Sequence, residues 1–320
     1  MKLGIGFPQQ HVTDDNLLYA KQLGVTHIVV HNPRLGDKGI LELDPLKALK
    51  DLIHKHDLEF AAIENLPNDH WDDILHAGPQ RDKQIDNIGQ TLHNMGKMGI
   101  PILGYYFSIV KVWGHWRNYK GGGRGGCGIK SFDMEKVPDT STHETGAVSI
   151  DEMWERLEYY LKRIVPIAEE AGVKLAAHQD DPPAEYLRGI GRLLTNHNNM
   201  QRLLDMVPSP NNGLEFCQGT VAEMGPDKVI DAIHRFGKQQ KIFYVHFRNV
   251  QGQFPKFDEV FIDEGDVNMF DAIQAYKDVN YDGVLIPDHC PIIQGESNYR
   301  HRGMAFSLGY MRALLQFAQR

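Results

Sequence analysis

The sequence lacks the features that mark secreted, membrane-bound and nucleic-acid-binding proteins. Its 320 residues contain three cysteines, which cannot form a closed disulfide framework. No run of about 18 apolar residues occurs, and the first residues lack the apolar core of a signal peptide. Its 34 lysines and arginines are outnumbered by 42 acidic residues and form no basic block. We therefore expect a cytoplasmic protein with neither membrane nor nucleic acid as a partner.

What the sequence does contain is an alternation of short apolar runs with longer amphipathic stretches. The predicted strands are Leu3–Phe7, His27–His31, Phe60–Glu64, Ile102–Phe107, Lys174–His178, Gly213–Cys217, Ile242–Phe247 and Gly283–Pro287. The predicted helices are Asp14–Leu23, Asp44–His56, Asp82–Met98, Ile150–Ala171, Glu185–His197, Pro226–Phe236, Met269–Lys277 and Gly303–Phe317. Such an alternation is typical of parallel βα units. It predicts a single-domain (β/α)8 TIM barrel over residues 1–320, with a doubly wound open sheet as the alternative.

One segment, residues 109–149, interrupts the alternation after the fourth predicted strand. It is long, polar and glycine-rich, with KGGGRGGCGIK at residues 120–130. The glycines do not have the spacing of a phosphate loop, because Gly128 is followed by Ile129 rather than by lysine. A loop of this length inside a compact domain usually has a function. We expect a mobile lid or a contact between subunits.

The last four predicted strands end in side chains that bind metal ions. These are His178, Cys217, His246 and Asp288. The carboxyl ends of barrel strands meet at one rim, where the active sites of such enzymes lie. Imidazole, thiolate and carboxylate together suit a divalent transition metal such as Mn2+, Fe2+ or Zn2+. The set does not choose among these ions, and each residue taken singly also fits a buried structural role.

Further polar residues are expected on the same inward faces. Strand alternation turns Arg248 the same way as His246, where its guanidinium would clamp a substrate carboxylate. The alternative for Arg248 is a surface ion pair. Glu215 precedes the cysteine by two residues, Glu64 ends the third strand and Tyr105 lies on the fourth. Their roles as substrate contacts or structural partners stay open.

The stretch AAHQDDPP places two acids and two prolines directly after His178. Aspartate before proline is typical of a helix start, so Asp181 is expected to cap the following helix. Asp180 is expected to hold the imidazole of His178 in the orientation that a metal ligand needs.

The motifs resemble the mannonate dehydratases, a barrel family related in fold to xylose isomerase. The resemblance covers most of the chain and is densest in HQDDPP (178–183), NNGLEFCQGT (211–220), VHFRNV (245–250), PDH (287–289) and NYRHRGMAFSLGYMRALL (298–315). The segments ENLP (64–67) and YYFSIVKVW (105–113) also resemble parts of the family.

The resemblance implies a role for each matched residue. His178, Cys217, His246 and Asp288 match the ligands of an Mn2+ or Fe2+ ion. His289 and Tyr299 match two acid/base residues, and Arg248 matches a substrate-contacting arginine. Glu64 and Tyr105 are our further candidates for substrate contacts. The implied reaction removes water from D-mannonate to give 2-keto-3-deoxygluconate, through loss of the carbon-2 proton and the carbon-3 hydroxyl. Which of His289 and Tyr299 is the base is open. The expected partner is a small sugar acid, and the expected assembly is a homo-oligomer.

Two departures from the family pattern leave other substrates and reactions open. Gln179 stands where proline is expected, and the glycine-rich stretch replaces a segment that helps to cover the active site in the family. A metal-dependent sugar isomerase or epimerase, which loses no water, is one alternative. A metal- or sugar-binding barrel without turnover is the other.

Overall fold

The predicted strands form a closed parallel barrel in the computed structural model, which describes residues 1–36, 39–118, 121–137 and 142–319. Around the barrel the order is β1-β2-β3-β4-β7-β10-β11-β14, and β14 closes on β1 through pairs such as Leu3 with Leu285. The barrel strands are β1 (Lys2–Pro8), β2 (His27–His31), β3 (Glu59–Glu64), β4 (Ile102–Tyr105), β7 (Lys174–His178), β10 (Asn212–Cys217), β11 (Ile242–His246) and β14 (Val284–Ile286). The predicted TIM barrel is thereby confirmed, and the open sheet is excluded.

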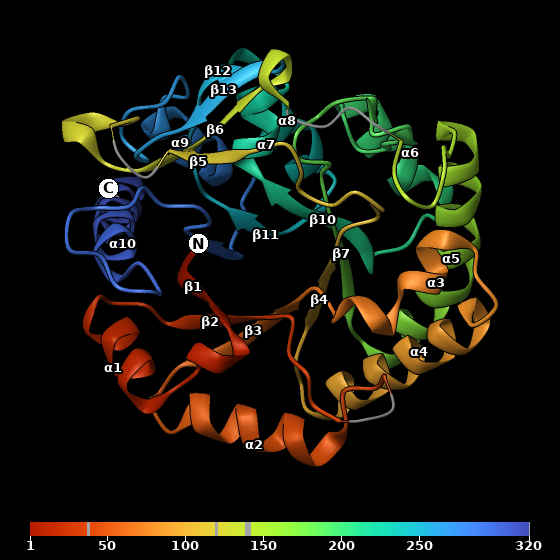
Figure 1. Cartoon of the computed structure of the whole chain (residues 1–320). Coiled ribbons are helices and arrows are strands. Elements are labelled where there is room, and N and C mark those ends of the chain that lie inside the picture. Colours follow the sequence, from red (N-terminus) through yellow and green to blue (C-terminus); the bar gives the residue numbers. More distant parts are fainter. Residues whose placement is uncertain (37–38, 119–120, 138–141, 320) are drawn as a thin grey trace.

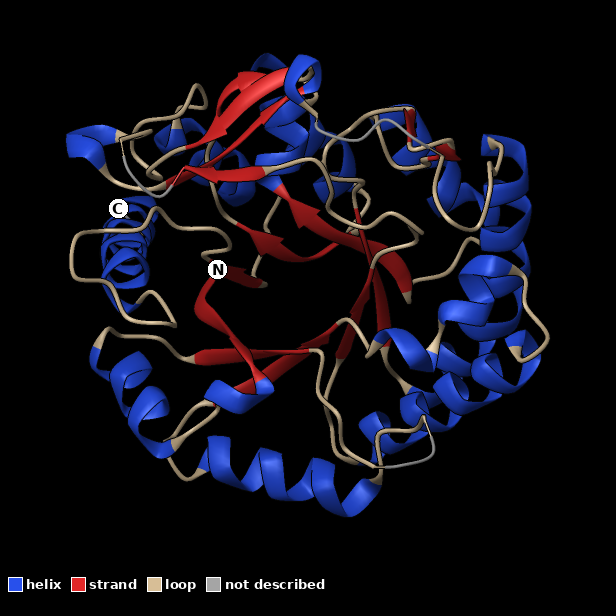
Figure 2. Cartoon of the chain, in the orientation of Figure 1, coloured by secondary structure: helices blue, strands red, loops and turns tan. Residues whose placement is uncertain are grey.

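Helices surround the barrel on its outer side (Figures 1 and 2). They are α1 (Asp14–Gln22), α2 (Leu43–His54), α3 (Asp72–His76), α4 (Arg81–Lys97), α5 (Ile150–Ala171), α6 (His197–Met206), α7 (Gln218–Glu223), α8 (Val229–Lys238), α9 (Met269–Asp278) and α10 (His301–Ala318). Short 3-10 turns occur at Gln9–His11, Asn68–His70, Arg124–Gly126, Met134–Lys136 and Pro226–Lys228. The longest helix, α5, begins with a capping box between Ser149 and Glu152 and ends at Gly172, whose φ is 69°. Among the described residues, no helix combines the length and apolar character that a membrane span requires.

The interior of the barrel changes from apolar to polar toward its C-terminal rim. A small buried cluster inside the barrel includes Ala62, Ala176, Tyr244 and Ile286. Since strand side chains alternate, the residue two positions further along each strand faces the same interior. Those residues are Glu64, His178, His246 and Asp288. The barrel core therefore supports polar groups that converge at the rim.

The segment predicted as the helix Glu185–His197 folds differently. It contains an antiparallel hairpin of β8 (Tyr186–Leu187) and β9 (Ile190–Gly191), and the helix α6 begins only at His197. The turn residues Arg188 and Gly189 have positive φ angles of 52° and 76°, which a helix does not permit. The apolar residues of this stretch are buried as a hairpin over the rim, so their spacing misled the helix prediction.

The glycine-rich insertion is part of a second sheet. Its strands β5 (Trp116–Asn118) and β6 (Ile129–Asp133) join β12 (Gln251–Gln253) and β13 (Lys256–Glu259) in the order β12-β13-β6-β5. Phe132 pairs with Phe257 across β6 and β13, and the two rings stack 5.4 Å apart. The described part of the insertion is thus tied to the segment after β11 rather than forming a free lid. Residues 119–120 and 138–141 lie outside the described residues, and the expected subunit contact stays a prediction.

Candidate active site

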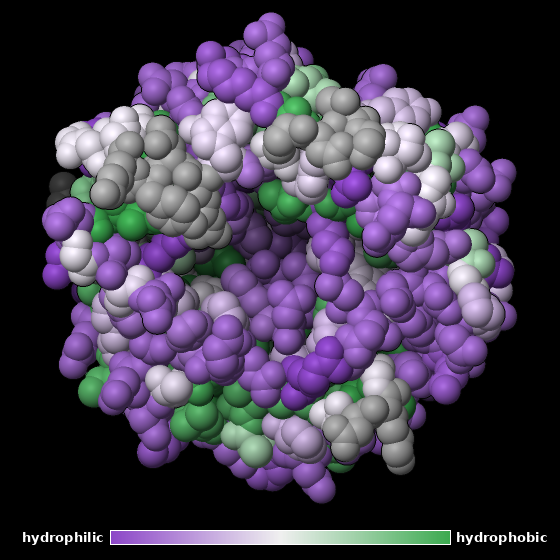
Figure 3. Space-filling model, viewed as in Figure 1, coloured by the Kyte–Doolittle hydropathy of each residue, from purple (hydrophilic) through white to green (hydrophobic). Residues whose placement is uncertain are grey.

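A cavity of about 830 Å3 opens at the C-terminal rim of the barrel. Its lining includes Glu64, His178, His246, Asp288 and His289. Figure 3 shows the hollow at the centre of this face, with mainly hydrophilic residues around it. A polar cavity at this rim is where barrel enzymes bind their substrates.

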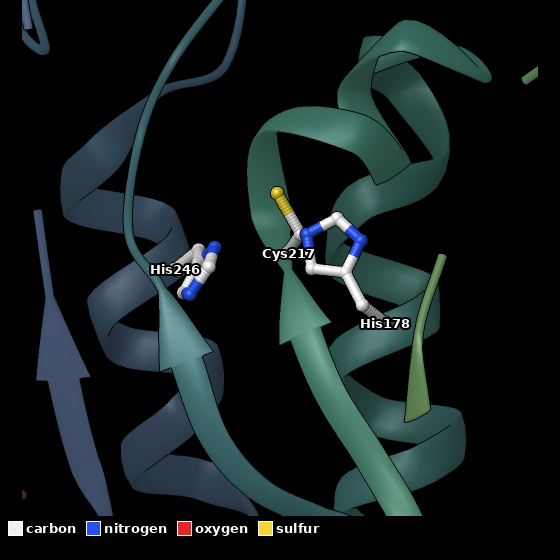
Figure 4. Close-up of side chains that lie close together, drawn as sticks. All are labelled: His178, Cys217 and His246. Atoms are coloured by element: carbon white, nitrogen blue, oxygen red, sulfur yellow. The ribbon is translucent and has the colours of Figure 1, made fainter. Parts of the chain in front are cut away.

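Three of the predicted metal ligands lie close together, and two of them, His178 and His246, line this cavity. The donor atoms of His178, Cys217 and His246 all lie within 4.8 Å of one another. Figure 4 shows the two imidazoles on either side of the cysteine, each at the end of its own strand. Asp288 follows β14 closely, and its Oδ2 lies 3.6 Å from Nδ1 of His246. The geometry therefore brings three of the four predicted ligands together and places Asp288 beside one of them, His246.

The orientation of each imidazole is fixed by a neighbour outside the set. Nδ1 of His178 lies 2.6 Å from the carbonyl oxygen of Gln179, to which it donates, so Nε2 is the nitrogen left for a ligand. Nε2 of His246 lies 2.9 Å from Glu64 Oε2 and 3.0 Å from Glu215 Oε1. Its Nδ1 is buried without a hydrogen-bond partner among the described residues. A carboxylate behind a histidine is the usual support of a metal-binding imidazole.

Charges around the cysteine favour the thiolate form. Burial opposes ionisation of Cys217, but the charges of Arg248 and His178 outweigh it and hold the pKa of the thiol well below its usual range. Burial also opposes the charged form of His178, yet the neighbouring Cys217 raises the pKa of that imidazole to about 10. The thiol also accepts a hydrogen bond of 3.2 Å from the hydroxyl of Thr220. The chain thus keeps the sulfur in the form that binds metal.

The two buried glutamates beside His246 have opposite protonation preferences. Burial would raise the pKa of Glu64, but the charges of His31 and His246 lower it to about 2. Burial and the charge of Glu64 raise the pKa of Glu215 above its usual range. Because two adjacent carboxylates do not both ionise readily, the ionised form is favoured at Glu64 and disfavoured at Glu215.

Arg248 does not reach the cavity. Its guanidinium is buried and donates to three carboxylates: Nε to Asp288 at 2.9 Å, Nη1 to Glu223 at 3.0 Å and Nη2 to Asp181 at 2.8 Å. Every nitrogen of the fork is therefore occupied, and no edge remains for a substrate carboxylate. This geometry supports neither the expected substrate contact of Arg248 nor a surface ion pair, because its ion pairs are buried.

The two acids after His178 do not act as the sequence suggested. Asp181 caps no helix, since none begins there, and it pairs with Arg248 and lies 3.2 Å from Nε2 of His115. Asp180 accepts from the backbone N–H groups of residues 193 and 194, at 2.9 and 2.8 Å, and does not hold His178. Both acids are buried because the hairpin β8–β9 folds over them. Their role depends on contacts far along the chain.

Gln179, the residue that departs from the expected proline, joins two barrel strands. Its Nε2 donates to the carbonyl oxygen of Glu215 at 3.0 Å, and its Oε1 accepts from the backbone N–H of Cys217 at 2.8 Å. It is 1% exposed, so both hydrogen bonds are shielded from water. Gln179 thereby fixes the end of β10 that carries the cysteine.

His289 has partners that the sequence did not reveal. Its Nδ1 lies 2.8 Å from Oε2 of Glu259 on β13, and its Nε2 lies 2.9 Å from Nζ of Lys130 on β6. These contacts fit a ring that donates from Nδ1 to Glu259 and accepts at Nε2. Lys130 ends the glycine-rich stretch, but no local signal connects it to a residue 159 positions away.

Like Cys217 and Arg248, the predicted site residues Tyr299 and Tyr105 lie outside the cavity lining. Tyr299 is 8% exposed, and its hydroxyl donates to the carbonyl oxygen of Gly6 at 2.7 Å. The ring of Tyr105 packs against Tyr160 of α5, and its neighbour Tyr106 lines the cavity instead. Adjacent residues of an extended segment point to opposite sides, which explains why Tyr106 rather than Tyr105 faces the cavity.

Fold and donor set together define the class, a barrel with the fold of the xylose isomerase-like proteins and a candidate metal site at its rim. The xylose isomerase domain protein of Planctomyces limnophilus superposes with a TM-score of 0.66 at 12% identity, over 99% of this chain and 98% of that chain. A D-tagatose 3-epimerase-like protein gives 0.66 at 15% identity, over 100% and 98%. At such identities the likeness shows the fold alone.

The chain belongs to the D-mannonate dehydratase (UxuA) family, whose model matches residues 7–145 and 141–320. Mannonate dehydratase 2 of Halalkalibacterium halodurans is 31% identical over 326 residues, which cover 93% of this chain and 92% of that protein. A mannonate dehydratase of Streptococcus equi subsp. zooepidemicus is 32% identical over 279 residues, with coverages of 79% and 76%. The crystal structure of the enzyme from Streptococcus suis serotype 2 superposes with a TM-score of 0.89 at 28% identity, over 100% of this chain and 95% of that chain.

Proposed function

We propose that this protein is a metal-dependent hydro-lyase that converts D-mannonate to 2-keto-3-deoxygluconate and water. The observation that carries the proposal is the convergence of His178, Cys217 and His246 beside a polar cavity, with His289 in its wall. Membership of the D-mannonate dehydratase family supports the choice of substrate. The cavity supplies both a place for an ion and a group that can transfer a proton.

His178, Cys217, His246 and Asp288 would hold the ion. The fit rests on their donor chemistry and on Nδ1 of His246, which is buried without a hydrogen-bond partner in the described chain. Glu64 and Glu215 occupy the other nitrogen of His246, so we assign them the support of this ligand rather than a direct substrate contact. When bound, the ion supplies polarisation of the substrate carboxylate, which acidifies the proton on carbon 2.

The chain itself supplies the proton transfer. His289 lines the cavity with Nδ1 held by Glu259, and its Nε2, which lies 2.9 Å from Nζ of Lys130, would exchange that lysine for a substrate. A positioned imidazole can take the carbon-2 proton or assist the departure of the carbon-3 hydroxyl. Tyr299 remains the second acid/base candidate, and it would have to exchange its hydrogen bond to Gly6 for one to the substrate. Arg248 holds Asp288 and stabilises the thiolate of Cys217 by its charge.

Several finer properties belong to the same proposal. We assign Mn2+ or Fe2+ as the ion from membership of the D-mannonate dehydratase family, because the donor set itself does not choose among divalent metals. We also propose that the chain folds as one domain, works in the cytoplasm on a small sugar acid and assembles as a homo-oligomer. Analytical ultracentrifugation of the purified protein tests the assembly.

The test of the function is a search for a 2-keto acid product. Purified protein loaded with Mn2+ is incubated with D-mannonate, and the new keto group is trapped with semicarbazide and followed by its absorbance. Turnover that disappears after chelation supports the metal-dependent dehydratase. A product of unchanged mass would instead establish isomerisation or epimerisation.

A further inference from the structure

A buried arginine that the metal centre does not use lines the same cavity. Arg192 follows β9 in the segment that folds over the rim, and it is 1% exposed. Its Nη1 donates to the carbonyl oxygen of Lys111 at 2.9 Å and lies 3.3 Å from the hydroxyl of Ser108. These two contacts fix one edge of the guanidinium against the loop that follows β4.

The other edge of this guanidinium has no hydrogen-bond partner. Nε and Nη2 of Arg192 are both buried, and neither donates a hydrogen bond within the described chain. These two nitrogens lie on the same side of the planar guanidinium and can donate in parallel. Buried donors without partners are costly, because they have lost water without gaining a replacement.

Asp180 forms an ion pair with this edge but makes no hydrogen bond to it. Oδ1 of Asp180 is 3.4 Å from Nη2 of Arg192 and accepts no hydrogen bond among the described residues, while Oδ2 is held by two backbone N–H groups. Asp180 is 6% exposed and also lines the cavity. The cavity wall thus offers donors and an acceptor side by side, in fixed positions.

The sign of the charges indicates which ligand group fits. A carboxylate placed on the free edge of Arg192 would face the negative Oδ1 of Asp180 across a short distance. A hydroxyl can accept from Arg192 and donate to Asp180 at the same time, so it satisfies both. A sugar acid presents several hydroxyls beyond carbon 3, which take no part in bond breaking.

We infer that Arg192 and Asp180 form a subsite that binds a distal hydroxyl of the sugar-acid substrate and so selects among sugar acids. The inference rests on the proposed function, because it places the chain of the substrate between the metal centre and this wall. A site built to bond a hydroxyl discriminates strongly against an analogue that lacks it, since the buried polar groups then stay unpaired.

The test combines variants of the protein with deoxy analogues of the substrate. Binding constants from calorimetry and kcat/KM are measured for D-mannonate and for its 4-, 5- and 6-deoxy analogues, with the wild-type protein and with Arg192→Met. The wild type should disfavour one analogue by about 10- to 100-fold, and the variant should lose that discrimination while binding D-mannonate correspondingly more weakly. Arg192→Lys keeps the charge but loses the paired edge, so it serves if the first variant does not fold.

Arg34→Met is the matched control. Arg34 also lines the cavity, but its two terminal nitrogens are both bonded to Asp69, at 3.0 and 2.6 Å. This variant should keep the discrimination of the wild type. The Arg192 variants could instead bind and convert all four compounds more weakly by the same factor, with the discrimination unchanged. That result would overturn the subsite alone. A wild type that neither binds nor converts D-mannonate would overturn the proposed function, and the subsite with it.

Discussion

Nδ1 of His289 lies 2.8 Å from Oε2 of Glu259, although the histidine follows the last barrel strand and the glutamate belongs to the second sheet. The second sheet is therefore part of the active site and not only a cover for it. Lys130 on the neighbouring strand β6 approaches the same imidazole.

Glu259→Gln should slow proton transfer without preventing binding. The amide keeps the shape of the side chain but loses the charge that orients the imidazole. We expect kcat to fall by about 10- to 100-fold with little change in KM, since positioned acid–base catalysis contributes about 100- to 10,000-fold in total. Steady-state kinetics checks this. Asp258→Asn, on the same strand but bonded to Ser131, is the control and should retain kcat.

Cys217→Ser should weaken metal binding. The hydroxyl of serine is a far poorer ligand than the thiolate that the charges of Arg248 and His178 maintain. We expect the affinity for Mn2+ to fall by at least about 10-fold, measured by titration calorimetry and by the metal content of the purified protein. Cys127→Ser removes a cysteine outside the site and should leave both unchanged. Equal metal content in the two variants would remove Cys217 from the ligand set.

Gln179→Leu should destabilise the metal-free protein. It leaves the backbone N–H of Cys217 and the carbonyl of Glu215 buried without their partner. Each such group costs about 1 to 3 kcal/mol, so the free energy of unfolding in urea should fall by about 2 kcal/mol or more. Gln201→Leu, at a half-buried helix position whose hydrogen bond to Asp205 is exposed, should change it by less than about 0.5 kcal/mol. Similar losses in both variants would contradict the bridging role.

Stability should fall in mild acid because of histidines far from the metal site. Burial, followed by the charges of Arg235 and Lys228, lowers the pKa of His197 below its usual value. As the pH falls through about 6.5, the unfolded chain takes up a proton that the folded state does not, so folding becomes less favourable. Urea unfolding at about pH 7.5 and about pH 5.5 measures this. His197→Gln should lose less stability than the wild type between these two conditions, and an equal loss would refute the assignment.

The barrel strands could be predicted because a parallel strand that is buried on both faces has to be apolar along its length. The ends of the predicted strands also identified four candidate metal ligands, which are His178, Cys217, His246 and Asp288. The partners of these residues could not be predicted in the same way. Their contacts depend on the hairpin β8–β9 and on the second sheet, which bring together segments far apart in the chain.

Two errors illustrate the limit of local reasoning. The apolar residues between 185 and 197 have a spacing that suits a helix, but they are buried as a hairpin that the positive φ angles of Arg188 and Gly189 close. Arg248 shares the inward face of His246 as predicted, yet three carboxylates from other elements occupy it. These carboxylates meet only in the tertiary structure, so their contacts cannot be predicted from any single segment of the sequence.

The most direct test of the central claim is mass spectrometry of D-mannonate after incubation with the Mn2+-loaded protein. The account predicts a product lighter by one water, formed by the wild type and absent with His289→Asn, whose metal content should match that of the wild type. Unchanged D-mannonate, from wild-type protein shown to hold the ion, would contradict the proposed dehydration.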